Sequence, residues 1–172
     1  MTRPTKPHLI LLSLCLAFLT VPFALQARAQ SPADNNPDLI EVRKYTLSMD
    51  KMEKLVAATQ ALNQYVAAHP AVKQKMDAGS SDNLSLDQKS KYFDANFPEA
   101  VAIIQQNGLS SREYIVVSLA FINDFSFVAM KRQGTLRDYP PNSITAENAT
   151  FVDANFDKLQ AMSQKLTPPD PN

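Results

Sequence analysis

Tryptophan is absent from this chain of 172 residues, which also contains only one cysteine, two histidines and three glycines. A single cysteine cannot form an internal disulfide, and these few cysteines and histidines do not supply a Cys/His zinc site or a c-type haem attachment motif. Three scattered glycines also exclude the glycine-rich loops that bind phosphate groups. Basic and acidic residues number 17 each, so the chain lacks the excess positive charge typical of nucleic-acid-binding proteins. We therefore expect no disulfide framework, no cofactor and no nucleic-acid partner.

Residues 1–29 show the three parts of a secretory signal peptide. Arg3 and Lys6 form a basic start, residues 9–24 are an apolar run, and residues 27–29, Ala-Arg-Ala, suit signal peptidase. The apolar run of 16 residues contains a proline and is shorter than the ~20 residues that span a membrane. We therefore predict cleavage after position 29 and a periplasmic or secreted mature chain without a membrane span. An uncleaved anchor and a lipoprotein are the alternatives.

Removal of this signal changes the inventory of reactive groups. Cys15 and His8 leave with it, so the mature chain keeps no cysteine and has His69 as its one histidine. Its 14 basic and 17 acidic side chains give a net charge of about −3. We expect residues 30–38 to be a disordered polar spacer and residues 168–172 to be a proline-rich tail.

The segment 39–167 predicts a single all-α domain. Four hydroxyl residues precede stretches in which apolar residues recur at helical spacing, and we interpret them as N-caps: Ser48, Ser85, Ser110 and Thr145. Two prolines, Pro70 and Pro98, open shorter helices. The second and third caps are followed three residues later by Gln88 and Glu113, which is the pattern of a capping box. Residues 39–45 are the one segment of this domain for which the sequence also allows an extended conformation.

Residues 111–133 form the predicted central helix. Of the 17 residues from 114 to 130, 13 are apolar, and the polar exceptions scatter around the helix without forming one polar face. Such a helix lies either in a membrane or in the interior of a bundle, and the carboxyl of Asp124 favours the bundle. We predict about four main helices packed around this buried one, the last being a single helix that follows Thr145 and carries its apolar stripe to Leu166.

One short sequence occurs twice. Asp94-Ala-Asn-Phe97 recurs as Asp153-Ala-Asn-Phe156, and six of 15 aligned positions match around it. The two copies lie at different distances from their helix caps. We therefore interpret the similarity as a shared preference of small, polar and aromatic residues for one kind of helix packing, with a true internal repeat as the alternative.

Asp124 is the main candidate for a functional side chain. Its neighbours one turn away on the predicted helix include no cation, so its carboxyl must meet a partner on another helix, water or a cavity. With Asn123, Phe121 and Phe125 it forms the candidate ligand-binding site, in which aromatic rings would line an apolar pocket. The alternative is a structural hydrogen bond or ion pair within the bundle.

Catalytic patterns are missing from the mature chain. A nucleophilic triad needs a base, for which His69 is the one histidine, and no Gly-x-Ser-x-Gly turn accompanies it. The Glu-x-x-His pairs of a di-iron bundle are absent, and the spacing of the acidic residues singles out no general acid/base pair. We therefore predict that the protein is not an enzyme.

A metal site is a minor hypothesis. Met49 and Met52 form a Met-x-x-Met step, and thioether sulfur favours copper(I) in exported proteins. His69 or Met76 would complete this site, and His69 together with a methionine would alternatively hold a haem. Methionines at helical spacing more often fill gaps in a core, which is the interpretation we favour.

Two parts of the chain resemble exported proteins. Residues 84–88, Leu-Ser-Leu-Asp-Gln, are similar to the Leu-Thr-x-x-Gln signature of small helical chaperones of Gram-negative envelopes, although a second copy of that signature is absent. The order of residues 108–114, an apolar helix and residues 144–151 is similar to uncharacterised exported bacterial proteins. We predict an exported, non-enzymatic helical protein that binds a protein partner or an apolar ligand in the cell envelope. A periplasmic chaperone-like factor is the alternative, and a metal or haem carrier is a more distant one.

Overall fold

The computed structural model describes residues 35–78 and 84–166, and every regular element in these two ranges is an α-helix, which confirms the predicted all-α fold class. The eight helices are α1 (Pro37–Lys44), α2 (Met49–Ala68), α3 (Pro70–Ala78), α4 (Leu86–Asn96), α5 (Pro98–Gln106), α6 (Ser111–Arg132), α7 (Ala146–Ala154) and α8 (Phe156–Leu166). The predicted signal peptide, residues 79–83 and the predicted proline-rich tail lie outside the described residues.

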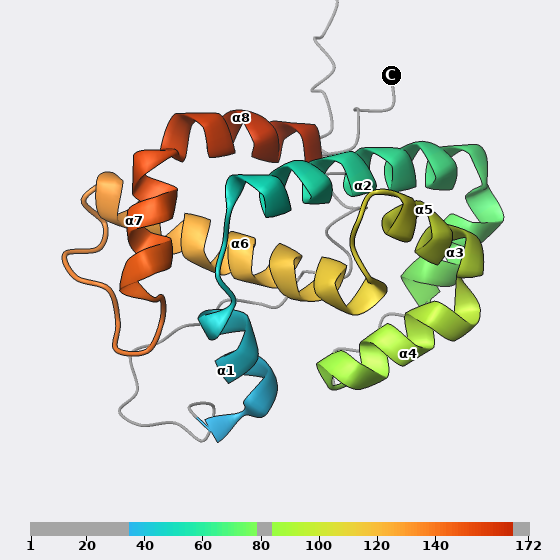
Figure 1. Cartoon of the computed structure of the whole chain (residues 1–172), viewed down its shortest axis with the longest axis horizontal. Helices are drawn as coiled ribbons and strands as arrows, with labels where there is room; N and C mark the ends of the chain where they lie inside the picture. The colour runs from blue at the N-terminus through green and yellow to red at the C-terminus, as the bar shows by residue number, and fades with distance from the viewer. Residues whose placement is uncertain (1–34, 79–83, 167–172) are drawn as a thin grey trace, which may run out of the picture.

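Helix α6 runs through the middle of the molecule (Figure 1). Helices α2 and α8 lie side by side along one flank of α6, and α1 and α4 lie on the opposite flank. Helix α7 covers one end of α6, whereas α5 contacts both α6 and α2 near the other end. The arrangement is therefore a bundle built around α6, as the sequence predicts.

The side chains of α6 confirm that it forms the centre of the core. Val116, Val117, Ala120 and Val128 are at most 2% exposed. They belong to one apolar cluster with buried side chains from other helices, among them Met52, Leu55, Ile104, Val152 and Leu159. The helix ends at Arg132, one residue before the predicted end, and Gly134 follows in the left-handed conformation at φ 73°.

Local signals predict the starts of α2 to α7 correctly. The side-chain oxygens of Ser48, Ser85, Ser110 and Thr145 each accept a hydrogen bond of 3.1–3.3 Å from the backbone N–H three residues later. Gln88 completes the first capping box, because its Oε1 accepts from the Ser85 N–H at 2.9 Å. The helices predicted to begin at two prolines are present as α3 and α5.

The second predicted capping box is wrong in one of its two bonds. Ser110 caps α6, but the carboxylate of Glu113 does not return to the Ser110 N–H. It accepts instead from the ammonium of Lys51 and, at 3.0 Å, from the hydroxyl of Tyr45. The hydrogen bond from Lys51 is the main reason why the pKa of Glu113 is lowered. The Glu113 carboxylate thus makes a long-range ion pair instead of the predicted local contact with the backbone.

The sequence left an extended conformation open for residues 39–45, but residues 37–44 form helix α1. Asn36 caps this helix by accepting from the Asp38 N–H at 3.0 Å, and Pro37 occupies its first turn. Helix α1 thus begins inside the predicted disordered spacer at 30–38, so the ordered domain starts two residues earlier than the predicted position 39.

The predicted final helix is in fact two helices that meet at Asn155. The Asn155 side-chain amide donates to the carbonyl of Phe151 at 2.8 Å, and where α4 ends, Asn96 makes the same bond to Tyr92 at 2.9 Å. Each copy of Asp-Ala-Asn-Phe therefore stands at the end of a helix, where the Asn amide satisfies a carbonyl of the last turn. This shared local role supports the interpretation of the similarity as one kind of helix packing.

Candidate functional site

The carboxyl of Asp124 lies inside the bundle, where the side chain is 0% exposed. Its Oδ1 accepts a hydrogen bond of 2.9 Å from the amide of Asn123, and its Oδ2 accepts one of 2.6 Å from the amide of Asn148 in α7. Asn123 also donates to the carbonyl of Ser143 at 2.8 Å. Both oxygens of the carboxyl are therefore engaged by neutral amides of the same chain.

Asn148 connects this carboxyl to the segment between α1 and α2. Its Oδ1 accepts from the Leu47 N–H at 3.0 Å, and its Nδ2 donates to the carbonyl of Tyr45 at 2.8 Å. Because a backbone N–H can only donate, these two bonds determine which way the side-chain amide faces. The Nδ2 group is therefore the one that meets Asp124, and a single side chain, 1% exposed, joins α6, α7 and the connection before α2.

Burial controls the ionisation of Asp124. Loss of contact with water raises its pKa from 3.8 to about 6, whereas the hydrogen bonds from Asn123 and Asn148 oppose part of this rise. The carboxyl therefore changes its protonation state in the mildly acidic range, at a position where three parts of the chain meet.

The aromatic members of the predicted ligand site form packing contacts. Phe121 is 3% exposed, and its ring centroid lies 5.4 Å from that of Phe125. The ring of Phe125 stacks on the ring of Phe156 with centroids 4.8 Å apart. The guanidinium of Arg132 lies over the Phe156 ring, 4.5 Å from its centroid. These rings close the junction of α6 with α8.

The structure thus divides the four candidate residues between two separate groups and favours the structural alternative. Asp124 and Asn123 belong to a buried hydrogen-bonded cluster, and Phe121 and Phe125 belong to an aromatic stack. Asn148 is the central member that sequence reasoning missed. The sequence did contain a signal for Asn148, because it lies one turn before Val152 and so shares the side of the helix that faces the core. A buried amide at such a position requires hydrogen-bond partners.

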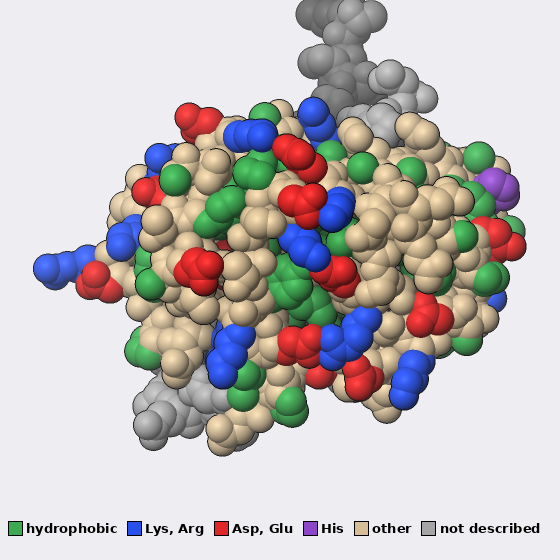
Figure 2. All heavy atoms as spheres, in the orientation of Figure 1, with side chains coloured by type: hydrophobic (Ala, Val, Ile, Leu, Met, Phe, Trp, Pro, Cys, Tyr) green, Lys and Arg blue, Asp and Glu red, His purple; other side chains and the backbone are tan. Residues whose placement is uncertain are grey.

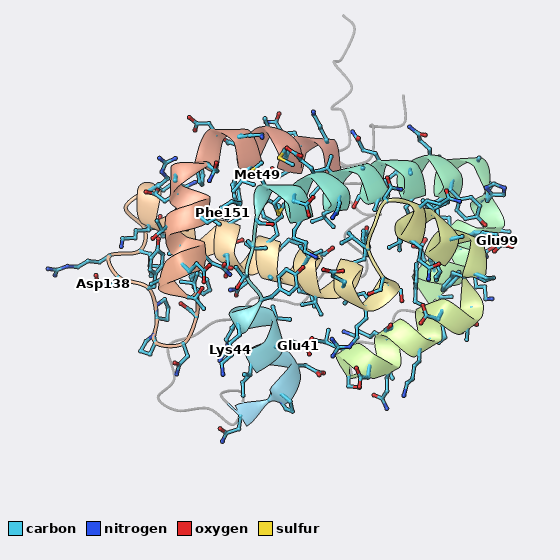
Figure 3. All side chains as sticks on the ribbon, in the orientation of Figure 1. Glu41, Lys44, Met49, Glu99, Asp138 and Phe151 are labelled. Carbon is cyan, nitrogen blue, oxygen red and sulfur yellow. The ribbon has the colours of Figure 1, made fainter. Side chains whose placement is uncertain are left out.

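The residues of the predicted metal site are not brought together. Met49 and Met52 lie in the first turn of α2, and Figure 3 labels Met49 at this end. His69 follows the last residue of α2, so at 1.5 Å per residue about 25 Å of helix separates it from Met52. Met52 is 0% exposed and fills the core, and the His69 ring contacts the carbonyl of Tyr65. This three-residue site is therefore wrong, and no cluster of three or more His, Cys, Asp or Glu within 35–78 and 84–166 is arranged to hold a metal ion.

One side of α6 carries apolar side chains that remain partly exposed. At ~100° per residue, the buried residues occupy one side of the helix, and the opposite side forms a strip that we call the outer strip. Its members are Ile115, Ser118, Leu119, Ile122, Ser126 and Ala129, all of which are partly or fully exposed. The one charged residue in the middle of α6, Asp124, lies on the buried side. The outer strip is therefore uncharged along about four turns.

By length and composition, α6 is also the one helix among the described residues that is long and apolar enough to cross a membrane, and 39% of its most apolar window is buried. A core helix of a soluble protein passes the same test. No protein-family model matches the chain, and no curated protein or solved structure shows significant similarity to it. The functional argument therefore rests on the chain's own geometry.

Proposed function

We propose that this chain is an exported, non-enzymatic protein of the cell envelope that binds a protein partner through the outer strip of α6. The observation that supports this proposal most directly is the partial exposure of Ile115, Leu119 and Ile122 on the one described helix that is long and apolar enough to cross a membrane. Apolar side chains that stay at the surface in a row favour association with another apolar surface. The strip extends over about 20 Å, which suits a partner helix with anchors at helical spacing.

A protein partner fits this surface better than a small apolar ligand. Small-molecule sites are concave, whereas the outer strip is the convex side of a helix. The expected pocket beside Asp124 contains hydrogen-bonded amides and stacked rings of the chain itself. The chaperone-like alternative has less support, because a chaperone needs a broad exposed apolar patch. Among the described residues, Leu39, at 38% exposure, is the one exposed large hydrophobic side chain.

Site-specific photo-crosslinking in the host tests this proposal. A benzoylphenylalanine at position 122 should form an adduct with one protein, and the same group at position 103, another partly buried isoleucine but in α5, should not. The purified partner should then bind the wild-type chain and lose at least ten-fold in affinity for Ile122→Arg, while Ile103→Arg keeps its affinity. Equal adducts at both positions, adducts with lipid alone, or equal affinity of the two variants would overturn the proposal.

A further inference from the structure

The connection between α5 and α6 contains the one Asn-Gly pair of the chain, Asn107-Gly108. The side-chain amide of an asparagine can be attacked by the backbone nitrogen of the next residue. A following glycine favours this reaction most, because it has no Cβ to hinder the approach of its nitrogen. The reactivity of this pair therefore depends on how the end of α5 holds it.

The turn at the end of α5 explains why this pair is present. Asn107 is the C-cap of the helix, at φ −93° and ψ 12°, and Gly108 follows in the left-handed conformation at φ 79°. The Gly108 N–H donates to the carbonyl of Gln105 at 2.9 Å, and a Cβ at Gly108 would lie 3.3 Å from Cε of Lys54. Backbone conformation and space therefore both favour glycine after this asparagine.

The pair lies at the surface of the molecule. Gly108 is exposed, and Asn107 is partly exposed. In Figure 1 the connection from α5 to α6 lies at the front of the molecule, and in the same part of Figure 2 the surface consists largely of backbone and uncharged polar side chains. Water can therefore reach the Asn107 side chain.

Two hydrogen bonds and one backbone angle restrain the reaction in the folded chain. The Asn107 Nδ2 donates to the carbonyl of Ile103 at 2.8 Å, and the Gly108 nitrogen is held by its bond to Gln105. At ψ 12° the Gly108 nitrogen is nearly eclipsed with the backbone nitrogen of Asn107, so it points away from the Asn107 side chain. The attack thus requires rotation about ψ and opening of the last turn of α5, a motion that helix ends make more readily than helix centres.

We propose that Asn107-Gly108 is a self-modification site and that the last turn of α5 sets its rate. The Gly108 nitrogen attacks Cγ of Asn107 and loses its proton, the new C–N bond closes a succinimide ring, and the side-chain nitrogen leaves as ammonia. Water then adds to either carbonyl of the ring and breaks one C–N bond. The product is aspartate or isoaspartate at position 107, and in isoaspartate the main chain runs through the side-chain carbon. Water is the one co-reactant.

Both products change the junction of α5 with α6. The amide that bonds to Ile103 becomes a carboxylate, which cannot donate and which the C-terminal end of a helix disfavours. Isoaspartate also adds one atom to the main chain before Leu109, which is 3% exposed, and before Ser110, which caps α6. The modification therefore loosens this junction as the chain ages. It is independent of the outer strip and of the proposed function.

Incubation of the purified full chain at neutral pH, followed by peptide mapping with mass spectrometry, tests the inference. Asn96 is the matched control, because its Nδ2 makes the same bond to a carbonyl of its own helix, at 2.9 Å, but the next residue is Phe97. Asn107 should be converted at least ten-fold faster than Asn96 in the folded chain. In urea, where the turn is absent, conversion of Asn107 should be at least ten-fold faster again.

Two glycine substitutions separate the turn from the intrinsic chemistry of the pair. Gln105 and Ala95 are exposed residues in the last turns of α5 and α4. Gln105→Gly weakens the helix beside Asn107, so it should raise the rate of conversion at least two-fold in the folded chain and leave the rate in urea unchanged. Ala95→Gly should leave the rate at Asn107 unchanged in both.

Three results would overturn the inference. If Asn107 in the folded chain is converted no faster than Asn96, the pair is not a modification site. Equal rates for Asn107 in the folded chain and in urea would show that the fold does not restrain the reaction. A rate that Gln105→Gly does not change would show that the last turn of α5 is not the restraint. None of these results depends on the Ile122→Arg test of the outer strip.

Discussion

Asn148 donates a hydrogen bond of 2.6 Å to the buried carboxyl of Asp124, although the two residues lie 24 positions apart in different helices. The orientation of the Asn148 amide is determined by its bonds to Leu47 and Tyr45, so Asp124 always meets a donor. A carboxyl placed in this way joins three parts of the chain. We therefore assign it a structural role.

Replacement of Asn148 by alanine tests this relationship. The substitution leaves the Leu47 N–H, the Tyr45 carbonyl and one oxygen of Asp124 without a buried partner. Each such group costs about 1–3 kcal/mol, so we expect the free energy of unfolding to fall by at least about 3 kcal/mol. Urea unfolding at neutral pH measures the change.

Asn96→Ala is the matched control, because this asparagine donates to a carbonyl of its own helix near the surface. It should cost about 1 kcal/mol or less, the usual net value of one hydrogen bond. Similar losses for the two variants would show that the Asn148 bridge contributes no more than an ordinary helix-end contact.

The ionisation of Asp124 should make stability depend on pH. Its folded pKa of about 6 lies above the ordinary value of 3.8, so the folded state favours the neutral acid. The stability from this difference is fully present below pH ~4 and is lost as the pH rises through about 6. The free energy of unfolding should therefore fall by about 2.4 kcal/mol between pH 4 and pH 7, since one pKa unit corresponds to about 1.4 kcal/mol and the unfolded carboxyl is already partly ionised at pH 4.

Asp124→Asn removes this titration and serves as the reference for the pH series. The difference in unfolding free energy between wild type and variant should change by the same amount over this range, whatever other groups titrate. A difference that stays constant from pH 4 to pH 7 would mean that the carboxyl has the same pKa in the folded and unfolded states.

The cap of α6 should behave differently from the cap of α4. Ser110→Ala should cost about 1 kcal/mol, because the Glu113 N–H loses its acceptor. A double-mutant cycle of Ser110→Ala with Glu113→Gln should show additive effects, since the Glu113 side chain bonds to Lys51 and Tyr45. The cycle of Ser85→Ala with Gln88→Ala should show coupling, because both bonds of that box are present. Thermal or urea unfolding compares the two cycles.

Export should produce a mature chain that begins at Gln30. The basic start, the apolar run at residues 9–24 and the small residues before position 30 together predict this cleavage. Intact-mass spectrometry of the protein from its own host measures the N-terminus directly. A protein that keeps residues 9–24 would favour the uncleaved anchor, and a lipid mass on Cys15 would favour the lipoprotein.

The sequence by itself determined most of the helices. Caps such as Ser48 and Ser85, and breaks such as the one before Pro70, act through atoms within four residues, so their consequences can be predicted without the fold. The sequence also predicts the central position of α6, because a helix that is apolar nearly all round has to be covered by other helices on several sides. The same local reasoning identified Asp124 as a carboxyl without a cation on its own helix.

Tertiary structure alone decided which groups these side chains meet. The partner of Asp124 is Asn148, the partner of Glu113 is Lys51, and the partner of Glu41 is Arg112, which lies 71 residues later. Helix α1 has local signals in its Asn36 cap and in Pro37, but its bonds to α4 and α6 exist only when the bundle brings distant segments together. A pairing between distant residues depends on how helices cross in space, and the spacing of residues along the chain does not contain that information.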